Sequence, residues 1–238
     1  HGAMCVSVSG RCFLSQFTTG RSGNRGDCVQ NCRRAYRIID EDGETDLEVH
    51  SDYLLSAKDL CALPFLDKLV DIGVDAFKIE GRNKGPDYVA TTVACYRRAL
   101  DAIRDGSFTA ELAKLLVDQL KTVFHREFSS GFYFDRPIAE FTQTPGNQAT
   151  LKKSFVGRVT NYFANAGVLE LEVLDSPLAV GDDIRVQGPT TGDMQLSVEE
   201  LRVDDMPTPD AVRGSTGVTL PCPEKVRRND RVFVLRDA

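Results

Sequence analysis

The apolar residues in the first half of the chain recur at helical spacing and predict three helices and one short strand. Ser56 has the sequence of an N-cap, so a helix is expected to begin there and to end at Gly73. Val74–Glu80 is expected to be a strand, and Pro86 favours the first position of a second helix. A third helix is expected over about residues 109–124. Alternation of helix, strand and helix is typical of an α/β layer or barrel.

From Ser154 onward the apolar period changes from 3.6 to 2, which indicates strands. Residues 169–173 alternate apolar and acidic side chains. Residues 180–186 and 228–234 each show a tight polar turn that leads into a strand. These features predict a compact antiparallel barrel of about six strands. The stretch Gln143–Asn147 reads as the linker before it.

The fold class expected is therefore α/β, the later part of an α/β-barrel-like domain, followed by a small antiparallel β-barrel domain. Residues 1–145 form the first domain and residues 150–238 the second. The first holds too few strands to close a parallel barrel. We expect a missing N-terminal half, or a partner chain, to complete it.

The composition is ordinary for a globular protein, with 42% hydrophobic and 27% charged residues among 238. No apolar run reaches the roughly 20 residues that span a bilayer, and no secretion signal is visible. We therefore expect a cytoplasmic protein with no membrane partner. The net charge of −6 argues against wholesale nucleic-acid binding.

Four cysteines crowd the first 32 residues in the arrangement C-x6-C-x15-C-x3-C: Cys5, Cys12, Cys28 and Cys32. They lie among Gly, Ser, Asn and Arg, so disulfides or a metal or iron–sulfur site explain them better than packing. A reducing cytosol and an odd total of seven cysteines favour the metal alternative. The first spacing suits zinc poorly, and a 4Fe-4S cluster is favoured. Cys61 is a fifth candidate that could replace Cys32.

The same segment is rich in arginine. Arg11, Arg21, Arg25 and Arg33 are candidate substrate-binding residues, because an RNA backbone, an anionic substrate or an anionic cluster would each suit them. The alternative is a solvated loop.

Lys78, Glu80 and Arg82 form the second candidate constellation. Strand geometry would place them on one face, at the C-terminal end of a strand where active sites of α/β domains gather. We take them as candidate catalytic residues, with a surface ion-pair ladder as the alternative. The histidines, His50 among them, lie in no zinc-peptidase or serine-nucleophile motif.

Together these residues resemble the peptidase U32 family, over roughly residues 1–105. The stretches that carry the resemblance are His1–Cys5, Ser9–Ser15, Gly20–Cys28, Cys32–Arg33, Ser56–Leu60 and Phe77–Arg82.

The resemblance implies an α/β-barrel-like catalytic domain, of which this chain would hold the later portion, with the small β-barrel that many members carry. The family name implies collagenase-like peptidase activity. Relatives act in tRNA uridine, rRNA cytidine and oxygen-independent ubiquinone hydroxylation, with prephenate as the oxygen source and a four-cysteine 4Fe-4S cluster. The implied ligands are Cys5, Cys12 and Cys28, with the fourth open between Cys32 and Cys61.

The leading hypothesis is an enzyme, an iron–sulfur protein of RNA hydroxylation that acts on tRNA uridine, with tRNA or another RNA as partner. The alternative is a collagenase-like peptidase. A third reading makes the C-terminal barrel an RNA- or protein-interaction module, although its acidic strand with Glu170 and Glu172 argues against phosphate binding there.

Overall fold

The computed structural model describes residues 1–36, 38–39, 46–47, 53, 55–136, 140–144 and 146–238. His50 lies outside the described residues. The chain divides into two compact units, residues 1–84 with 91–148 and residues 85–90 with 149–238. In the described part, no helix combines the length and the apolar character that crossing a bilayer requires.

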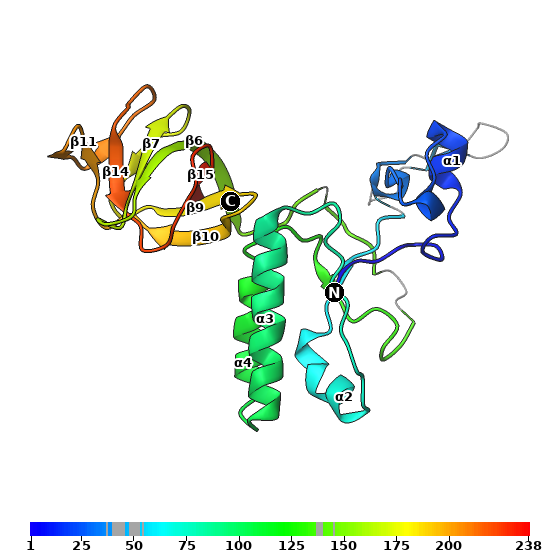
Figure 1. Cartoon of the computed structure of the whole chain (residues 1–238). Coiled ribbons are helices and arrows are strands. Elements are labelled where there is room, and N and C mark those ends of the chain that lie inside the picture. Colours follow the sequence, from blue (N-terminus) through cyan, green and yellow to red (C-terminus); the bar gives the residue numbers. More distant parts are fainter. Residues whose placement is uncertain (37, 40–45, 48–52, 54, 137–139, 145) are drawn as a thin grey trace. The chain divides into compact units, whose positions relative to one another are not determined.

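Unit 1 is built on a small sheet and a pair of long helices (Figure 1). β1 (Gly2–Ala3) pairs antiparallel with β4 (Asp59–Leu60), which pairs parallel with β5 (Phe128–Ser129). The longest helices are α3 (Pro86–Arg104), whose first turn belongs to unit 2, and α4 (Ala110–Leu120). The shorter elements are α1 (Leu14–Thr19), η1 (Gly23–Arg25), η2 (Asn31–Arg33), η3 (Leu63–Phe65), α2 (Leu66–Asp71) and the paired strands β2 (Ile38–Ile39) and β3 (Asp46–Leu47).

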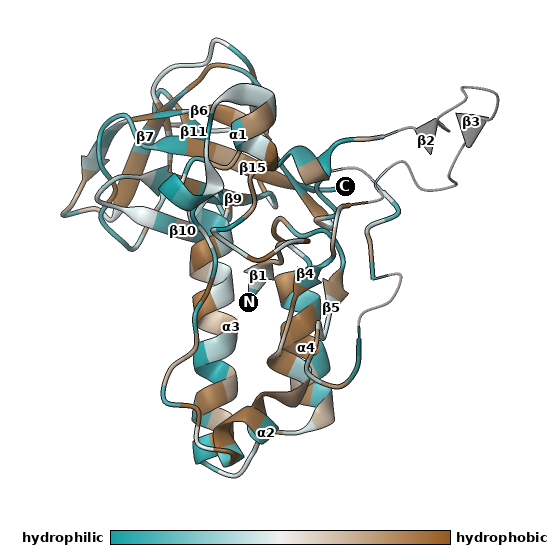
Figure 2. Cartoon of the chain, turned by 90° about the vertical axis from the view of Figure 1, so that its right-hand side faces the viewer, coloured by the Kyte–Doolittle hydropathy of each residue, from teal (hydrophilic) through white to brown (hydrophobic). Residues whose placement is uncertain are grey.

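The core of unit 1 lies between α3, α4 and the segment after β4. Tyr96 and Ala99 of α3 pack with Leu116 and Leu120 of α4 and with Leu63. Both helices carry apolar and polar residues (Figure 2), and the apolar residues named above are those that they bury in this core. The Thr109 hydroxyl caps α4 by accepting from the amide of Leu112 at 3.2 Å.

The helices predicted from Pro86 and over about 109–124 are confirmed. The helix predicted from Ser56 is wrong, because Asp59 and Leu60 form strand β4 and the helical segment begins only at Leu63. The strand predicted over Val74–Glu80 is also wrong. That segment is irregular, and its Glu80 amide donates to the carbonyl of His1 at 2.8 Å.

Unit 2 is an antiparallel sheet of eight strands in the order β10-β9-β15-β6-β7-β14-β11-β12. The long central strand β6 (Leu151–Phe163) pairs with β7 and β15, and bulges interrupt both pairings. The other strands are β7 (Val168–Val173), β9 (Asp183–Gly188), β10 (Gly192–Ser197), β11 (Arg202–Val203), β12 (Met206–Pro207), β14 (Val218–Pro221), β15 (Arg231–Asp237) and the separate pair β8 (Leu178–Ala179) and β13 (Asp210–Ala211).

The alternation at residues 169–173 is confirmed: Leu169, Leu171 and Val173 are buried in the core of unit 2. Gly157 permits the close approach of β6 and β7, since a Cβ there would overlap the carbonyl oxygen of Glu172. The predicted closed barrel is not confirmed, because in the described residues the two end strands, β10 and β12, do not pair with each other. The small antiparallel domain is thus present as a curved sheet with more strands than expected.

Candidate functional site

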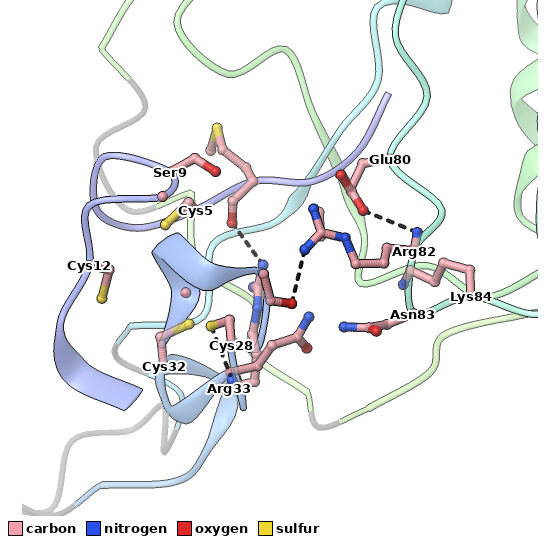
Figure 3. Close-up of a pocket in the computed structure, with 16 residues that line it drawn as sticks. Cys5, Ser9, Cys12, Cys28, Cys32, Arg33, Glu80, Arg82, Asn83 and Lys84 are labelled. Carbon is pink, nitrogen blue, oxygen red and sulfur yellow. Dashed lines mark hydrogen bonds between the residues drawn. The ribbon is translucent and has the colours of Figure 1, made fainter. Parts of the chain in front are cut away.

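Four cysteines line one pocket in unit 1, with a volume of about 280 Å³. Cys5 follows β1, Cys12 precedes α1, Cys28 lies between η1 and η2, and Cys32 lies in η2. Figure 3 shows their side chains on one side of the pocket and residues 80–84 on the other. The fold therefore brings together the four thiols that the spacing singled out.

Polar contacts hold the Cys28 sulfur in place. The amide of Gln30 donates to Sγ of Cys28 at 3.4 Å, and the hydroxyl of the buried Ser15 lies 3.6 Å from the same sulfur. Ser15 also accepts from the amide of Val29 at 3.3 Å. These contacts fix the position of the Cys28 sulfur at the edge of the pocket.

The four thiols influence one another electrostatically. Burial raises the pKa of Cys32, Arg33 opposes that rise, and Cys5, Cys28 and Cys12 add to it. Yet the described residues hold no group of three or more metal-ligating side chains close enough for a single ion. Because a 4Fe-4S cluster is larger than one ion, its ligands stand further apart. Four cysteine thiolates are the ligand set of such a cluster, and four thiols line this cavity.

Cys61 lies elsewhere. It is 3% exposed, belongs to the apolar core with Leu63 and Leu66, and does not line the cysteine pocket. Burial raises its pKa, which disfavours the thiolate. The structure thus places Cys32, and not Cys61, with Cys5, Cys12 and Cys28.

The predicted catalytic residues are divided between two cavities. Glu80 and Arg82 line the cysteine pocket, whereas Glu80 and Lys78 line a neighbouring cavity of about 490 Å³. Lys78 pairs with Glu80 at 3.8 Å, and Glu80 accepts from the Arg82 amide at 3.1 Å. The Arg82 guanidinium donates to the carbonyl of Gly26 at 3.1 Å and so ties residues 80–84 to the cysteine-bearing loop.

Of the four candidate substrate-binding arginines, Arg33 lines the pocket. Its guanidinium donates to the carbonyl of Met4 at 2.9 Å, to the Ser56 hydroxyl at 2.9 Å and to the carbonyl of Ala57. These bonds bind the segment before Cys5 to the strand region at β4, so Arg33 is a structural clamp beside the thiols.

The other three arginines are exposed and do not line the pocket. Arg21 pairs with Asp27 at 3.8 Å, and Arg25 donates to the Gln16 side chain at 2.8 Å. Arg11 is exposed beside Cys12. Their role in substrate binding stays a prediction.

A buried charge cluster next to the pocket was not expected from the sequence. Asp59, 1% exposed, lies 4.0 Å from the Lys84 ammonium and 3.7 Å from the Arg126 guanidinium, and it accepts from the Arg126 amide at 3.2 Å. The Lys84 ammonium also lies 3.3 Å from the centroid of the Phe124 ring. We call Asp59, Lys84 and Arg126 the Asp59 cluster.

The Asp59 cluster carries two cations for one anion, and Arg33 is close enough to interact with it. Burial lowers the pKa of Lys84 to about 8, with Asp59 opposing and Arg126 and Arg33 contributing to the decrease. Burial likewise lowers the pKa of Arg33, and the positive charge of Arg126 lowers it further. Lys84 and Arg33 both line the pocket, Arg33 on the side of the thiols and Lys84 across from them, so cations lie on both sides of the cavity (Figure 3). Such a pocket suits an anionic group.

The sequence contained little that could have revealed this cluster. The sequence pattern around Asp59 predicts the start of a helix. Lys84 and Arg126 lie 25 and 67 positions further along the chain. Only the pairing of β4 with β5 brings Asp59 near Arg126.

Comparison with known proteins gives a consistent result for unit 1. The model of the family described as "Peptidase family U32" matches residues 1–143. A protein named "Collagenase" from Porphyromonas gingivalis is 40% identical over 233 residues, which cover 98% of this chain and 56% of that protein.

Two further relatives carry RNA-modification names. The "tRNA hydroxylation protein P1" of Bacillus subtilis is 31% identical over 217 residues, covering 90% of this chain and 51% of that protein. A 23S rRNA 5-hydroxycytidine synthase of Escherichia coli is 37% identical over 190 residues, covering 78% of this chain and 25% of that protein. The chain spans between about a quarter and about three fifths of the length of these three relatives.

Proposed function

The chain belongs to peptidase family U32, and from this membership and the cysteine pocket we propose that it is an iron–sulfur protein of RNA hydroxylation, acting on tRNA uridine. The observation that carries the proposal is the convergence of Cys5, Cys12, Cys28 and Cys32 on one cavity. Relatives named for tRNA and rRNA hydroxylation support RNA as the substrate. A peptidase has no comparable need for four converging thiols.

In this proposal the four pocket cysteines hold a 4Fe-4S cluster, which supplies electron transfer when bound. The chain's own groups then have separate tasks. The Gln30 amide and the Ser15 hydroxyl orient the Cys28 sulfur, and the cations Arg33 and Lys84 offset the negative charge of the thiolates.

Glu80 and Arg82 complete the opposite wall of the pocket, where they are placed to orient a polar substrate group. Lys78, 84% exposed at its side chain, lies at the rim of the neighbouring cavity and suits a phosphate of the RNA. A prephenate co-substrate remains a prediction from the family resemblance.

The test is nucleoside mass spectrometry on RNA from a strain that lacks the gene. We expect loss of a hydroxylated uridine, restored by the wild-type gene and not by Cys28→Ser. A gene carrying Cys95→Ala should restore it as wild type does, because Cys95 is a buried core residue away from the pocket. An unchanged nucleoside profile in the deletion strain rules the proposal out.

The alternative is the peptidase activity that the name of the Porphyromonas relative states. Its identity of 40% exceeds that of the RNA-modification relatives, and this is the observation that favours it. Cleavage of gelatin by the iron-free protein, abolished by Glu80→Gln, would establish it. Intact gelatin after incubation with an iron-free wild-type protein would exclude it.

A further inference from the structure

Unit 2 carries a cluster of four exposed arginines that take part in none of the described ion pairs. Arg185, Arg202 and Arg236 each pair with a carboxylate, namely Asp193, Glu200 and Asp182. None of the described ion pairs includes the second set, which is Arg158, Arg227, Arg228 and Arg231. All four of these are exposed. Positive charge is therefore concentrated at one place on an otherwise acidic unit.

The sheet brings these arginines together. Arg231 of β15 is the cross-strand partner of Arg158 of β6, and the Arg158 guanidinium donates to the carbonyl of Asn229 at 3.3 Å. Arg227 and Arg228 lie in the turn that ends at Asn229 and Asp230. Like charges directly opposite one another on a sheet are destabilising, so this pairing has a cost that an anionic ligand would offset. We call these four residues the arginine patch.

The turn that presents the patch is held firmly. The buried carboxylate of Asp230, 2% exposed, accepts from the Arg227 amide at 2.8 Å and from the Thr191 hydroxyl. The Asp230 carbonyl accepts from the Val159 amide at 2.9 Å, which fastens the turn to β6. The Asp230 carboxylate is thus buried and bonded within the turn, and the described ion pairs include none between it and the patch.

Arg231 is oriented by aromatic rings. Its guanidinium carbon lies 4.8 Å from the ring centroid of Phe233 and 5.3 Å from that of Phe155, and the two rings pack edge to face at 5.7 Å. Stacking fixes the plane of the guanidinium and leaves its N–H groups available. The acidic residue nearest in register is Glu172, the cross-strand partner of Arg158 on β7, and the described ion pairs include no bond between them.

We propose that the arginine patch of unit 2 binds the phosphate backbone of a single-stranded stretch of RNA. This inference rests on the proposed RNA substrate and deepens it, by assigning RNA binding to residues of unit 2 outside the cysteine pocket. RNA suits the patch because four exposed guanidinium groups, on a turn and on the two paired strands beside it, match a run of phosphates. On the sequence alone, the acidic residues Glu170 and Glu172 argued against phosphate binding in this unit. Phosphate binding is assigned instead to other residues of the same unit, those of the arginine patch.

The test measures binding of a fluorescein-labelled single-stranded RNA to the full chain by fluorescence anisotropy, over a range of salt concentrations. The double variant Arg158→Gln/Arg228→Gln should bind more weakly. Its slope of log K against log salt should fall in magnitude by about 1.4, because each lost phosphate contact contributes roughly 0.7 for a single strand. The variant Arg158→Lys/Arg228→Lys keeps the charge and should retain the slope.

The matched control is Arg202→Gln/Arg213→Gln, which removes the same charge from exposed positions outside the patch. It should leave the slope within error of wild type. Equal losses in both double variants would show general electrostatics and overturn the proposal, as would a wild-type chain that fails to bind. Competition by polyglutamate as effective as that by unlabelled RNA would assign the patch to an acidic protein instead.

This experiment separates the inference from the proposed function. The patch variants could lower the salt slope of RNA binding while the deletion strain shows unchanged nucleosides. That result would support the RNA-binding patch and refute the hydroxylation function. Missing hydroxylated uridine with no effect of the patch variants would refute the patch alone.

Discussion

The Asp59 cluster makes a sharp prediction about stability, because one buried carboxylate serves two cations. Asp59→Asn keeps the size of the side chain and the acceptor for the Arg126 amide, and removes the charge. Lys84 and Arg126, with side chains only 8% and 13% exposed, would then lose the carboxylate that they share. The neutral amide cannot replace the lost attraction.

The size of the effect follows from burial and distance. Removing one partner of a buried ion pair costs about 3–5 kcal/mol. The separations of 4.0 Å and 3.7 Å lie at the long end of ion pairing, so we expect the lower end of that range, about 3 kcal/mol. At roughly 1.4 kcal/mol per factor of ten, this corresponds to an opening equilibrium about a hundredfold larger.

The chain has no tryptophan and two compact units, so a single optical transition would not isolate the effect. Amide hydrogen exchange followed by mass spectrometry resolves the units. Peptides from β4 and β5 should exchange about a hundredfold faster in Asp59→Asn, whereas peptides from β6 and β7 in unit 2 serve as the internal reference and should not change.

Asp101→Asn is the matched control, since Asp101 makes an exposed pair with Arg97 at 3.2 Å on α3. It should cost no more than about 0.5 kcal/mol. Adding Lys84→Met to Asp59→Asn should recover part of the loss by removing one of the two buried cations that Asp59 served. If the amides of β4 and β5 exchange as slowly in Asp59→Asn as in Asp101→Asn, Asp59 is not the counter-charge of Lys84 and Arg126, and the assignment is refuted.

Three further predictions concern single positions. Burial lowers the pKa of Lys84 in the folded chain to about 8 from 10.5, so the unfolded chain binds that proton more tightly. The free energy of unfolding of wild type, relative to that of Lys84→Met, should therefore rise between pH 8 and 10.5. A difference between the two proteins that does not vary with pH contradicts this. Cys32→Ser should lower the iron content of anaerobically purified protein while Cys61→Ser preserves it, and the reverse result would make Cys61 the fourth ligand. Gly157→Ala should destabilise unit 2 by about 1–3 kcal/mol through overlap with the Glu172 carbonyl, seen as a lower Tm; an unchanged Tm would mean that β6 and β7 separate easily.

Local signals explain what the sequence could predict. Pro86 and the apolar spacing after it identify α3, and the alternation around Leu171 identifies β7, because both depend on neighbouring residues. Residue type and spacing singled out the four cysteines of the pocket but left Cys61 open as a replacement for Cys32, and the structure places Cys32 in the pocket.

Long-range contacts explain what the sequence could not. Asp59 and Leu60 enter a strand because their partners, Gly2–Ala3 and Phe128–Ser129, lie far away along the chain. With β4 in place of a helix start, Cys61 enters the core and leaves the cysteine pocket. The Asp59 cluster depends on the same strand pairing, so local patterns could not predict it.

The central claim is that Cys5, Cys12, Cys28 and Cys32 together hold a 4Fe-4S cluster, and iron and acid-labile sulfide analysis of protein purified without oxygen tests it most directly. The account predicts a brown protein with about four irons and four sulfides per chain, and loss of both in a variant with all four residues changed to serine. A colourless, iron-free wild-type protein under those conditions would contradict it.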